Sequence, residues 1–161
     1  MIKRSFPPIV DADTRLMILG SLPGDRSLAA ARYYAHPQNQ FWRLISATIG
    51  RDVASLEYDA RLAVLSKAGV GLWDVVASAT RPGSTDAAIR DMAENDIAGL
   101  AATLPRLRAI GFNGATAYRH GSRQLGSVGI ALVPLPSSSP LHTVGFEAKR
   151  PAWAALGEYL R

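Results

Sequence analysis

The sequence predicts an α/β fold in which a parallel sheet carries helices on both faces. Four short apolar runs are typical of strands buried in such a sheet. Segments with helical periodicity lie between consecutive runs, and strands that alternate with helices form parallel sheets. The four runs are residues 15–19, 70–76, 107–112 and 130–135.

The chain begins with residues 1–15, which we predict to be an irregular arm leading into the first strand. That strand, residues 15–19, is followed by a long loop rich in glycine, proline and aromatic residues. Residues 41–49 then repeat apolar side chains at helical spacing, which predicts a helix with one buried face. Gly50 fits the C-terminal end of that helix.

A second helix is predicted over residues 57–68, closed by Gly69. The run 70–76 gives the second strand and its exit from the sheet. Residues 77–88 carry few charges and are predicted to be a loop that turns around residues 81–84.

Asn95 is a predicted N-cap for a helix over residues 96–104, which ends near Pro105. The third strand, residues 107–112, ends at Asn-Gly and enters a helix. The remaining predicted elements are that helix at about 115–125, a strand at 130–135 and a last helix at 147–160.

Composition indicates a compact protein with one domain spanning residues 1–161. Of the 161 residues 48% are hydrophobic and 19% are charged, which suits a globule with a sizeable core. No run of about 18 apolar residues predicts a membrane span. The N-terminus lacks the apolar segment of a signal peptide. We therefore expect a cytoplasmic protein of bacterial type, found with the chromosome, and a monomer.

Charge and cysteine content narrow the class of function. The chain has no cysteine, which excludes disulfides, zinc–thiolate sites and iron–sulfur clusters. We expect neither a metal nor a cofactor. The net charge of +5 favours a polyanionic partner such as DNA.

Two motifs lie at the carboxyl ends of strands, where parallel sheets bind their ligands. The first motif has two parts: residues 20–24 read Gly-Ser-Leu-Pro-Gly, and residues 33–42 read Tyr-Tyr-Ala-His-Pro-Gln-Asn-Gln-Phe-Trp. The second motif, near the other end of the chain, is Leu-Pro-Ser-Ser-Ser-Pro at residues 135–140. Together these motifs resemble the uracil-DNA glycosylase superfamily, and most closely its hypoxanthine-DNA glycosylase branch.

The resemblance implies a three-layer α/β/α sandwich around four parallel strands. It also implies a monofunctional DNA glycosylase that flips a deaminated base, uracil or hypoxanthine, out of DNA and hydrolyses its N-glycosidic bond. The flipped base needs a flat partner, and Tyr34 has the position of the aromatic residue that precedes Ala-His-Pro in relatives. Tyr33 is the alternative stacking partner, and both residues could instead pack the loop. Asn113, an amide at the end of a strand, suits the edge of the base, although Asn-Gly also forms ordinary turns.

Asn39 is the catalytic residue that the resemblance implies. An amide is no general base, but it can hold a water molecule and direct its carbonyl dipole at positive charge on the sugar. Mismatch-specific relatives carry a catalytic asparagine where this chain has Leu22. That departure leaves the chemistry to Asn39 or to Asp25, a carboxylate able to activate water. Ser21 and Leu22 are expected beside the base.

The serine-rich loop and its surroundings are predicted to contact the DNA. Three hydroxyl groups between two prolines suit phosphate contacts. An apolar side chain after them can fill the space left by a flipped base. The residues predicted for DNA contacts are Ser137, Ser138, Ser139, Leu141, His142, His36, Lys149 and Arg150. Each histidine and each basic residue also has an ordinary structural or solvated interpretation.

Two other functions compete with glycosylase chemistry. A binding module of the same fold, catalytically weak or inactive, is favoured by the missing asparagine at position 22. A serine hydrolase built on the serine loop and His142 is disfavoured because the chain has no Gly-x-Ser-x-Gly motif.

Overall fold

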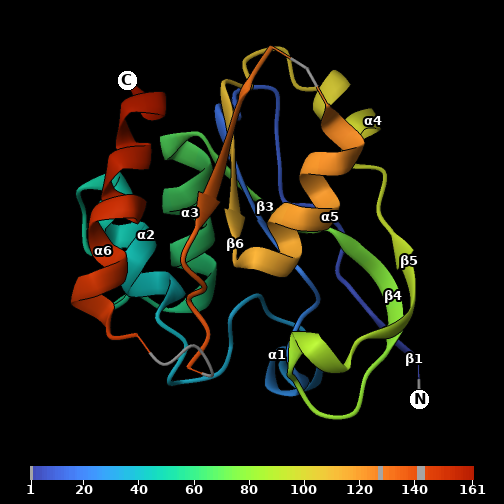
Figure 1. Cartoon of the computed structure of the whole chain (residues 1–161). Coiled ribbons are helices and arrows are strands. Elements are labelled where there is room, and N and C mark those ends of the chain that lie inside the picture. Colours follow the sequence, from blue (N-terminus) through green and yellow to red (C-terminus); the bar gives the residue numbers. More distant parts are fainter. Residues whose placement is uncertain (1, 127–128, 141–143) are drawn as a thin grey trace.

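The computed structural model describes residues 2–126, 129–140 and 144–161. Its main body is a parallel sheet flanked by helices, and a small second sheet lies to one side (Figure 1). The strands of the main sheet are β2 (Leu16–Gly20), β3 (Val70–Asp74), β6 (Ala109–Asn113) and β7 (Ala131–Leu135). The helices are α1 (Asp25–Ala30), α2 (Phe41–Ile49), α3 (Tyr58–Ala68), α4 (Ile97–Ala102), α5 (Ala115–Leu125) and α6 (Phe146–Ala155).

The four main strands are parallel and lie in the order β3-β2-β6-β7. Their carboxyl ends therefore meet at one edge, as the sequence predicts. Gly20 pairs in register with Asp74, and Asn113 pairs with Leu135. This register places the loops after β2, β3, β6 and β7 around a common space.

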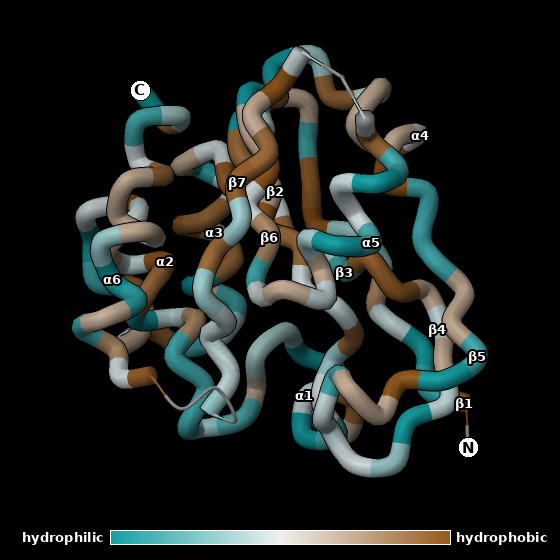
Figure 2. Tube along the Cα trace, in the orientation of Figure 1, coloured by the Kyte–Doolittle hydropathy of each residue, from teal (hydrophilic) through white to brown (hydrophobic). Residues whose placement is uncertain are grey.

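Helices cover both faces of the sheet because side chains of the strands alternate between them. Leu16 and Ile18 of β2 pack with α2, α3 and α6, whereas Met17 and Leu19 pack with α4 and α5. All four side chains are fully buried. Figure 2 shows hydrophobic residues concentrated along these strands and on the inner sides of the helices. The predicted three-layer α/β/α architecture is confirmed.

A second, antiparallel sheet was not predicted. It has the order β1-β4-β5 and is built from β1 (Ile2–Arg4), β4 (Val76–Thr80) and β5 (Arg90–Glu94). The arm at residues 1–15 and the loop at 77–88 are therefore partly strand. These segments are short and mostly polar or half-exposed, and their pairing partners are distant in sequence, so local patterns gave no signal.

Two predicted details differ at helix ends. The N-cap of α4 is Asp96, whose side chain accepts the Gly99 N–H, while Asn95 donates to Ser5 and to the Asp74 carbonyl. The last helix is α6 followed by a 3₁₀ segment, η2 (Leu156–Leu160). Among the described residues, no helix has the length and apolar character needed to cross a bilayer.

Candidate active site

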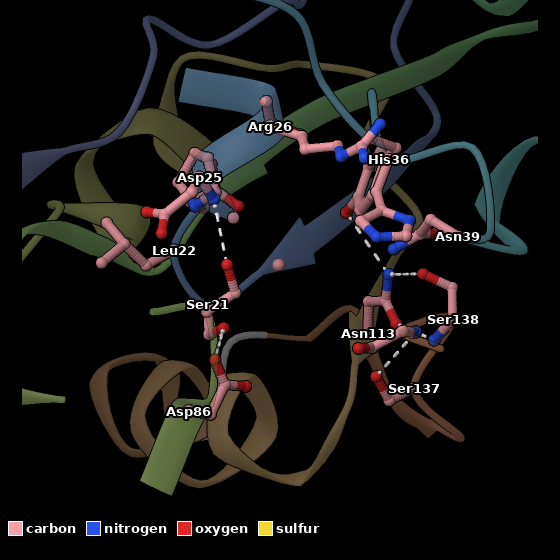
Figure 3. Close-up of a pocket in the computed structure, with 18 of the residues that line it drawn as sticks. Ser21, Leu22, Asp25, Arg26, His36, Asn39, Asp86, Asn113, Ser137 and Ser138 are labelled. Carbon is pink, nitrogen blue, oxygen red and sulfur yellow. Dashed lines mark hydrogen bonds between the residues drawn. The ribbon is translucent and has the colours of Figure 1, made fainter. Parts of the chain in front are cut away.

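A cavity of about 430 Å³ lies at the carboxyl edge of the main sheet. It is open to solvent, and its walls come from the carboxyl ends of β3 and β6, the segments after β2 and β7, and residues 84–87 between β4 and β5. Of the predicted site residues, the cavity brings together Ser21, Leu22, Asp25, Tyr34, His36, Asn39, Asn113, Ser137, Ser138 and Ser139. Figure 3 shows Asn39, His36, Asn113 and Ser138 on one side, opposite Ser21, Leu22, Asp25 and Asp86.

Tyr34 lines this cavity. One face of its ring is stacked on Phe41, with ring centroids 3.9 Å apart and planes 10° apart. The Trp42 indole N–H donates to the Tyr34 carbonyl, and Tyr34 adopts a left-handed φ of 53°. Such a backbone costs about 1–3 kcal/mol and persists where the surroundings enforce it. Tyr33, the alternative stacking partner, also lines the cavity, but it is 4% exposed and its hydroxyl donates to the Pro7 carbonyl.

Asn113 is held rigidly at the end of β6. Its Oδ1 accepts the backbone N–H of Ser138 at 2.8 Å, and its Nδ2 donates to the Ser138 hydroxyl at 2.8 Å. A longer contact of 3.4 Å joins Nδ2 to the Tyr34 hydroxyl. Ser138 is 1% exposed, so the phosphate contact predicted for it is not available in this structure. Its observed role is to orient the Asn113 amide.

Asn39 lies beside the N-terminus of α2. Its Oδ1 accepts the Phe41 N–H at 2.9 Å, which fixes the side chain in a local turn. Within the described part of the chain its Nδ2 has no hydrogen-bond partner, and the residue lines the cavity. The neighbouring His36 accepts the Gln38 N–H on Nδ1. The neutral His36 ring therefore carries its proton on Nε2.

The start of the first motif is fixed by a buried arginine that the sequence did not indicate. Arg81 is 2% exposed and donates to the carbonyls of Leu22, Pro23 and Gly83. Leu22 is itself buried and packs with Val76 of β4. This contact between the small sheet and the first motif defines one wall of the cavity.

Asp25, the predicted alternative base, lies at the rim. Its side chain is 56% exposed and forms an ion pair of 2.6 Å with Lys3. Arg26 lines the same rim and is exposed; Figure 3 shows its guanidinium directed toward His36. No ion pair of Arg26 occurs within the described ranges. The sequence did not single it out.

The remaining residues predicted to contact DNA lie in different parts of the structure. Lys149 is 1% exposed, and among the described residues its ammonium group donates to the Ser139 carbonyl at 3.5 Å, so it supports the serine loop from behind. Burial lowers the pKa of Lys149. Arg150 is exposed and lies on another groove, between α2 and α6. Leu141 and His142 fall outside the described residues.

Two carboxyl groups in the cavity were missed, the buried Asp74 and the partly exposed Asp86. Asp74 ends β3 and is 4% exposed; burial first, and the charge of Asp86 second, raise its pKa to about 7. Asp86 accepts the Ser21 hydroxyl at 2.7 Å and lies 3.9 Å from Arg81. Burial also raises the pKa of Asp86. Asp74 directly follows a buried run, and this was the one available signal.

These groups do not form a metal site. No cluster of three or more histidine, aspartate or glutamate side chains able to hold a metal ion occurs among the described residues. The cavity offers an aromatic ring, two amides and carboxyl groups around a space that opens to solvent. Its volume lies within the range of about 300–1,000 Å³ that is usual for small-ligand pockets.

The fold and the cavity are those of an α/β/α protein with a ligand-sized site at the carboxyl edge of its parallel sheet. A family model described as the uracil DNA glycosylase superfamily matches residues 7–157. This chain belongs to the uracil DNA glycosylase superfamily, and its enzyme class is that of the DNA glycosylases.

Similar proteins come from two archaea. A protein of Methanosarcina acetivorans named hypoxanthine DNA glycosylase is 39% identical over 156 residues, which is 97% of this chain and 98% of that protein. One of Methanosarcina barkeri with the same name is 38% identical over 154 residues, 96% and 97% of the two chains. A solution NMR structure of an M. acetivorans protein superposes with a TM-score of 0.89 at 39% identity, covering 99% of each chain.

Proposed function

We propose that this protein hydrolyses the N-glycosidic bond of hypoxanthine in DNA. The observation that carries the proposal is the cavity at the sheet edge. The ring of Tyr34, stacked on Phe41, the oriented amide of Asn113 and the amide of Asn39 all line this one space. Glycosylases act on a base rotated out of the duplex into such a pocket. The names of the two Methanosarcina relatives support hypoxanthine as the base.

Tyr34 and Asn113 bind the flipped base in this proposal. Stacking of a base on an aromatic side chain contributes about 1–3 kcal/mol. Because Phe41 covers the other face of Tyr34, the ring is fixed before the base arrives. Ser138 likewise fixes the Asn113 amide, whose long contact to the Tyr34 hydroxyl is the one that a base edge can replace.

Asn39 acts at the sugar. Breaking the bond between C1′ and the base gives the sugar oxocarbenium character, as in glycoside hydrolysis generally. One lone pair of Asn39 Oδ1 is held by the Phe41 N–H, which leaves the other lone pair and the Nδ2 protons for water and sugar. A fixed dipole of this kind stabilises developing charge without reorganisation. Asp25 stays the alternative, although its ion pair with Lys3 directs it toward the surface.

Positive and polar groups at the rim bind the DNA backbone. Arg26 is exposed at the rim and His36 carries an N–H that can face a phosphate or the departing base. Ser137 lies on the opposite wall. No lysine is among the described residues that line the cavity, so we propose release by water alone, without a strand-cleaving step.

The test is base release from labelled oligonucleotides that each carry one hypoxanthine, uracil, xanthine or thymine, both single-stranded and in duplexes. Abasic sites are detected by alkaline cleavage. We expect release from hypoxanthine DNA and intact strands before alkali. Uracil is included because the family model carries that activity in its name. Tight binding to hypoxanthine DNA without release would instead favour an inactive binding module.

A further inference from the structure

Asp74 is a buried carboxyl group that faces the cavity and has no part in the chemistry described above. It lies beside Gly20 in the parallel register and is 4% exposed. Its Oδ2 atom is enclosed and has no hydrogen-bond partner among the described residues. A Cβ at Gly20 would lie 2.6 Å from Asp74 Oδ1 and 3.1 Å from the Tyr34 hydroxyl. The glycine thus lets the carboxyl group and the stacking ring share this part of the cavity.

No group around Asp74 forms an ion pair with its carboxyl group in the described segments. The titratable neighbours are Asp86 and Arg81 from the connection beside β4, and Tyr33 and Tyr34 from the loop after β2. Arg81 directs its guanidinium at three loop carbonyls. Burial raises the pKa of Asp74 to about 7, the charge of Asp86 adds to the rise and Arg81 opposes it.

An unpartnered buried carboxyl group destabilises the fold that contains it. Perturbed and unpartnered ionisable groups in clefts are concentrated where ligands bind or react. A carboxyl group that keeps its proton near neutral pH is a proton donor, as an ordinary aspartate is not. Hypoxanthine needs such a donor, because the base takes the electron pair of the broken C1′–N9 bond.

We propose that Asp74 is the general acid of this site and protonates the departing base. This inference rests on the proposed function. As the C1′–N9 bond breaks, its electron pair goes to the base, and the Asp74 carboxyl proton passes to a ring nitrogen of that base. Water forms the new bond to C1′ and gives up one proton, which returns the Asp74 carboxylate to its acid form. The products are the neutral free base and an abasic sugar.

The main test is the single-turnover rate of hypoxanthine release as a function of pH. The wild-type rate should be level below about pH 7 and should fall about tenfold per pH unit above it, because the acid form is lost. Asp74→Asn keeps the size of the side chain but has no proton to transfer. It should lower the plateau by roughly 10²–10⁴-fold and abolish the fall with pH. Asp86→Asn should move the fall to lower pH, since the charge of Asp86 raises the pKa of Asp74.

The experiments distinguish a wrong function from a wrong role of Asp74. If the wild-type protein releases no hypoxanthine at any pH, the proposed function is wrong and the role of Asp74 falls with it. If the wild type releases hypoxanthine and Asp74→Asn reproduces both its rate and its pH profile, only the role of Asp74 is overturned.

Thermal unfolding gives a readout independent of activity. The folded-state pKa of Asp74 is raised to about 7 from 3.8, so the wild type loses stability as pH rises between these values. Asp74→Asn has no such loss. Its Tm should exceed that of the wild type increasingly from about pH 4 to about pH 7, with a constant difference above. A difference in Tm that does not change with pH, or a variant that fails to fold, would contradict the inference that the Asp74 carboxyl group has no partner.

Discussion

Replacing Asn39 by alanine is expected to lower the single-turnover rate of hypoxanthine release by roughly 10²–10³-fold. The reason is the loss of a fixed amide dipole beside the sugar at the moment when positive charge develops there. The measurement is the rate of alkali-sensitive strand formation at saturating enzyme. Binding of the same DNA should change much less, because the base contacts of Tyr34 and Asn113 remain.

The alanine variant also loses a local turn, since Asn39 Oδ1 accepts the Phe41 N–H. Asn39→Ser is the matched control, because a serine hydroxyl can accept the same N–H. We expect serine to restore the Tm but not the rate. A serine variant with the wild-type rate would mean that Asn39 is a structural residue only, and would return catalysis to Asp25.

Replacing Arg81 by alanine is expected to lower the free energy of unfolding by about 3 kcal/mol or more. The carbonyls of the buried residues Leu22 and Pro23 lose their donor, and each unsatisfied buried group costs about 1–3 kcal/mol. Base release should fall as well, because these carbonyls belong to the wall of the cavity. Urea unfolding and single-turnover kinetics measure the two effects.

Arg81→Lys separates charge from geometry. A lysine keeps the positive charge near Asp86 but cannot form the planar fork that serves three carbonyls. We expect the lysine variant to recover only a small part of the lost stability. Full recovery by lysine, or an alanine variant as stable as the wild type, would show that the three carbonyl contacts do not hold the loop.

Local pattern was sufficient for the main sheet and for the helices that cover it, but it missed the short helix α1 in the predicted long loop. The predicted helix at residues 41–49 coincides with α2, and the one at about 115–125 coincides with α5. Both have apolar residues at helical spacing and end at a glycine. The small sheet escaped because β5 (Arg90–Glu94) is a half-exposed, mostly polar strand whose partner is fixed only by tertiary structure.

Site residues that belong to a sequence motif could be predicted. Site residues whose chemical properties depend on burial in the fold could not. Tyr34, Asn39 and Asn113 lie in recognisable motifs, and all three line the cavity. In the sequence Asp74 is an ordinary residue at the exit of a predicted strand, and Arg81 is an ordinary residue of a predicted loop. Their burial depends on contacts between the β4 region and the first motif, which join segments distant in sequence.

For Lys149 the sequence predicted an exposed contact where the structure has a buried side chain. A basic residue at the start of a helix near the serine loop suggests a phosphate contact. In the structure its side chain is buried, and within the described ranges its ammonium group donates to the Ser139 carbonyl. Arg26, which the sequence did not single out, occupies the exposed rim instead.

The most direct measurement is a structure of the protein bound to a duplex that contains one 2′-fluorinated deoxyinosine. The fluorine destabilises the oxocarbenium-like state and slows release, so that the intact nucleotide can be observed. We expect hypoxanthine outside the duplex, stacked on Tyr34, with its edge at Asn113 and its C1′ atom beside Asn39. A base that stays stacked in the DNA, or DNA bound elsewhere with the cavity empty, would contradict the account.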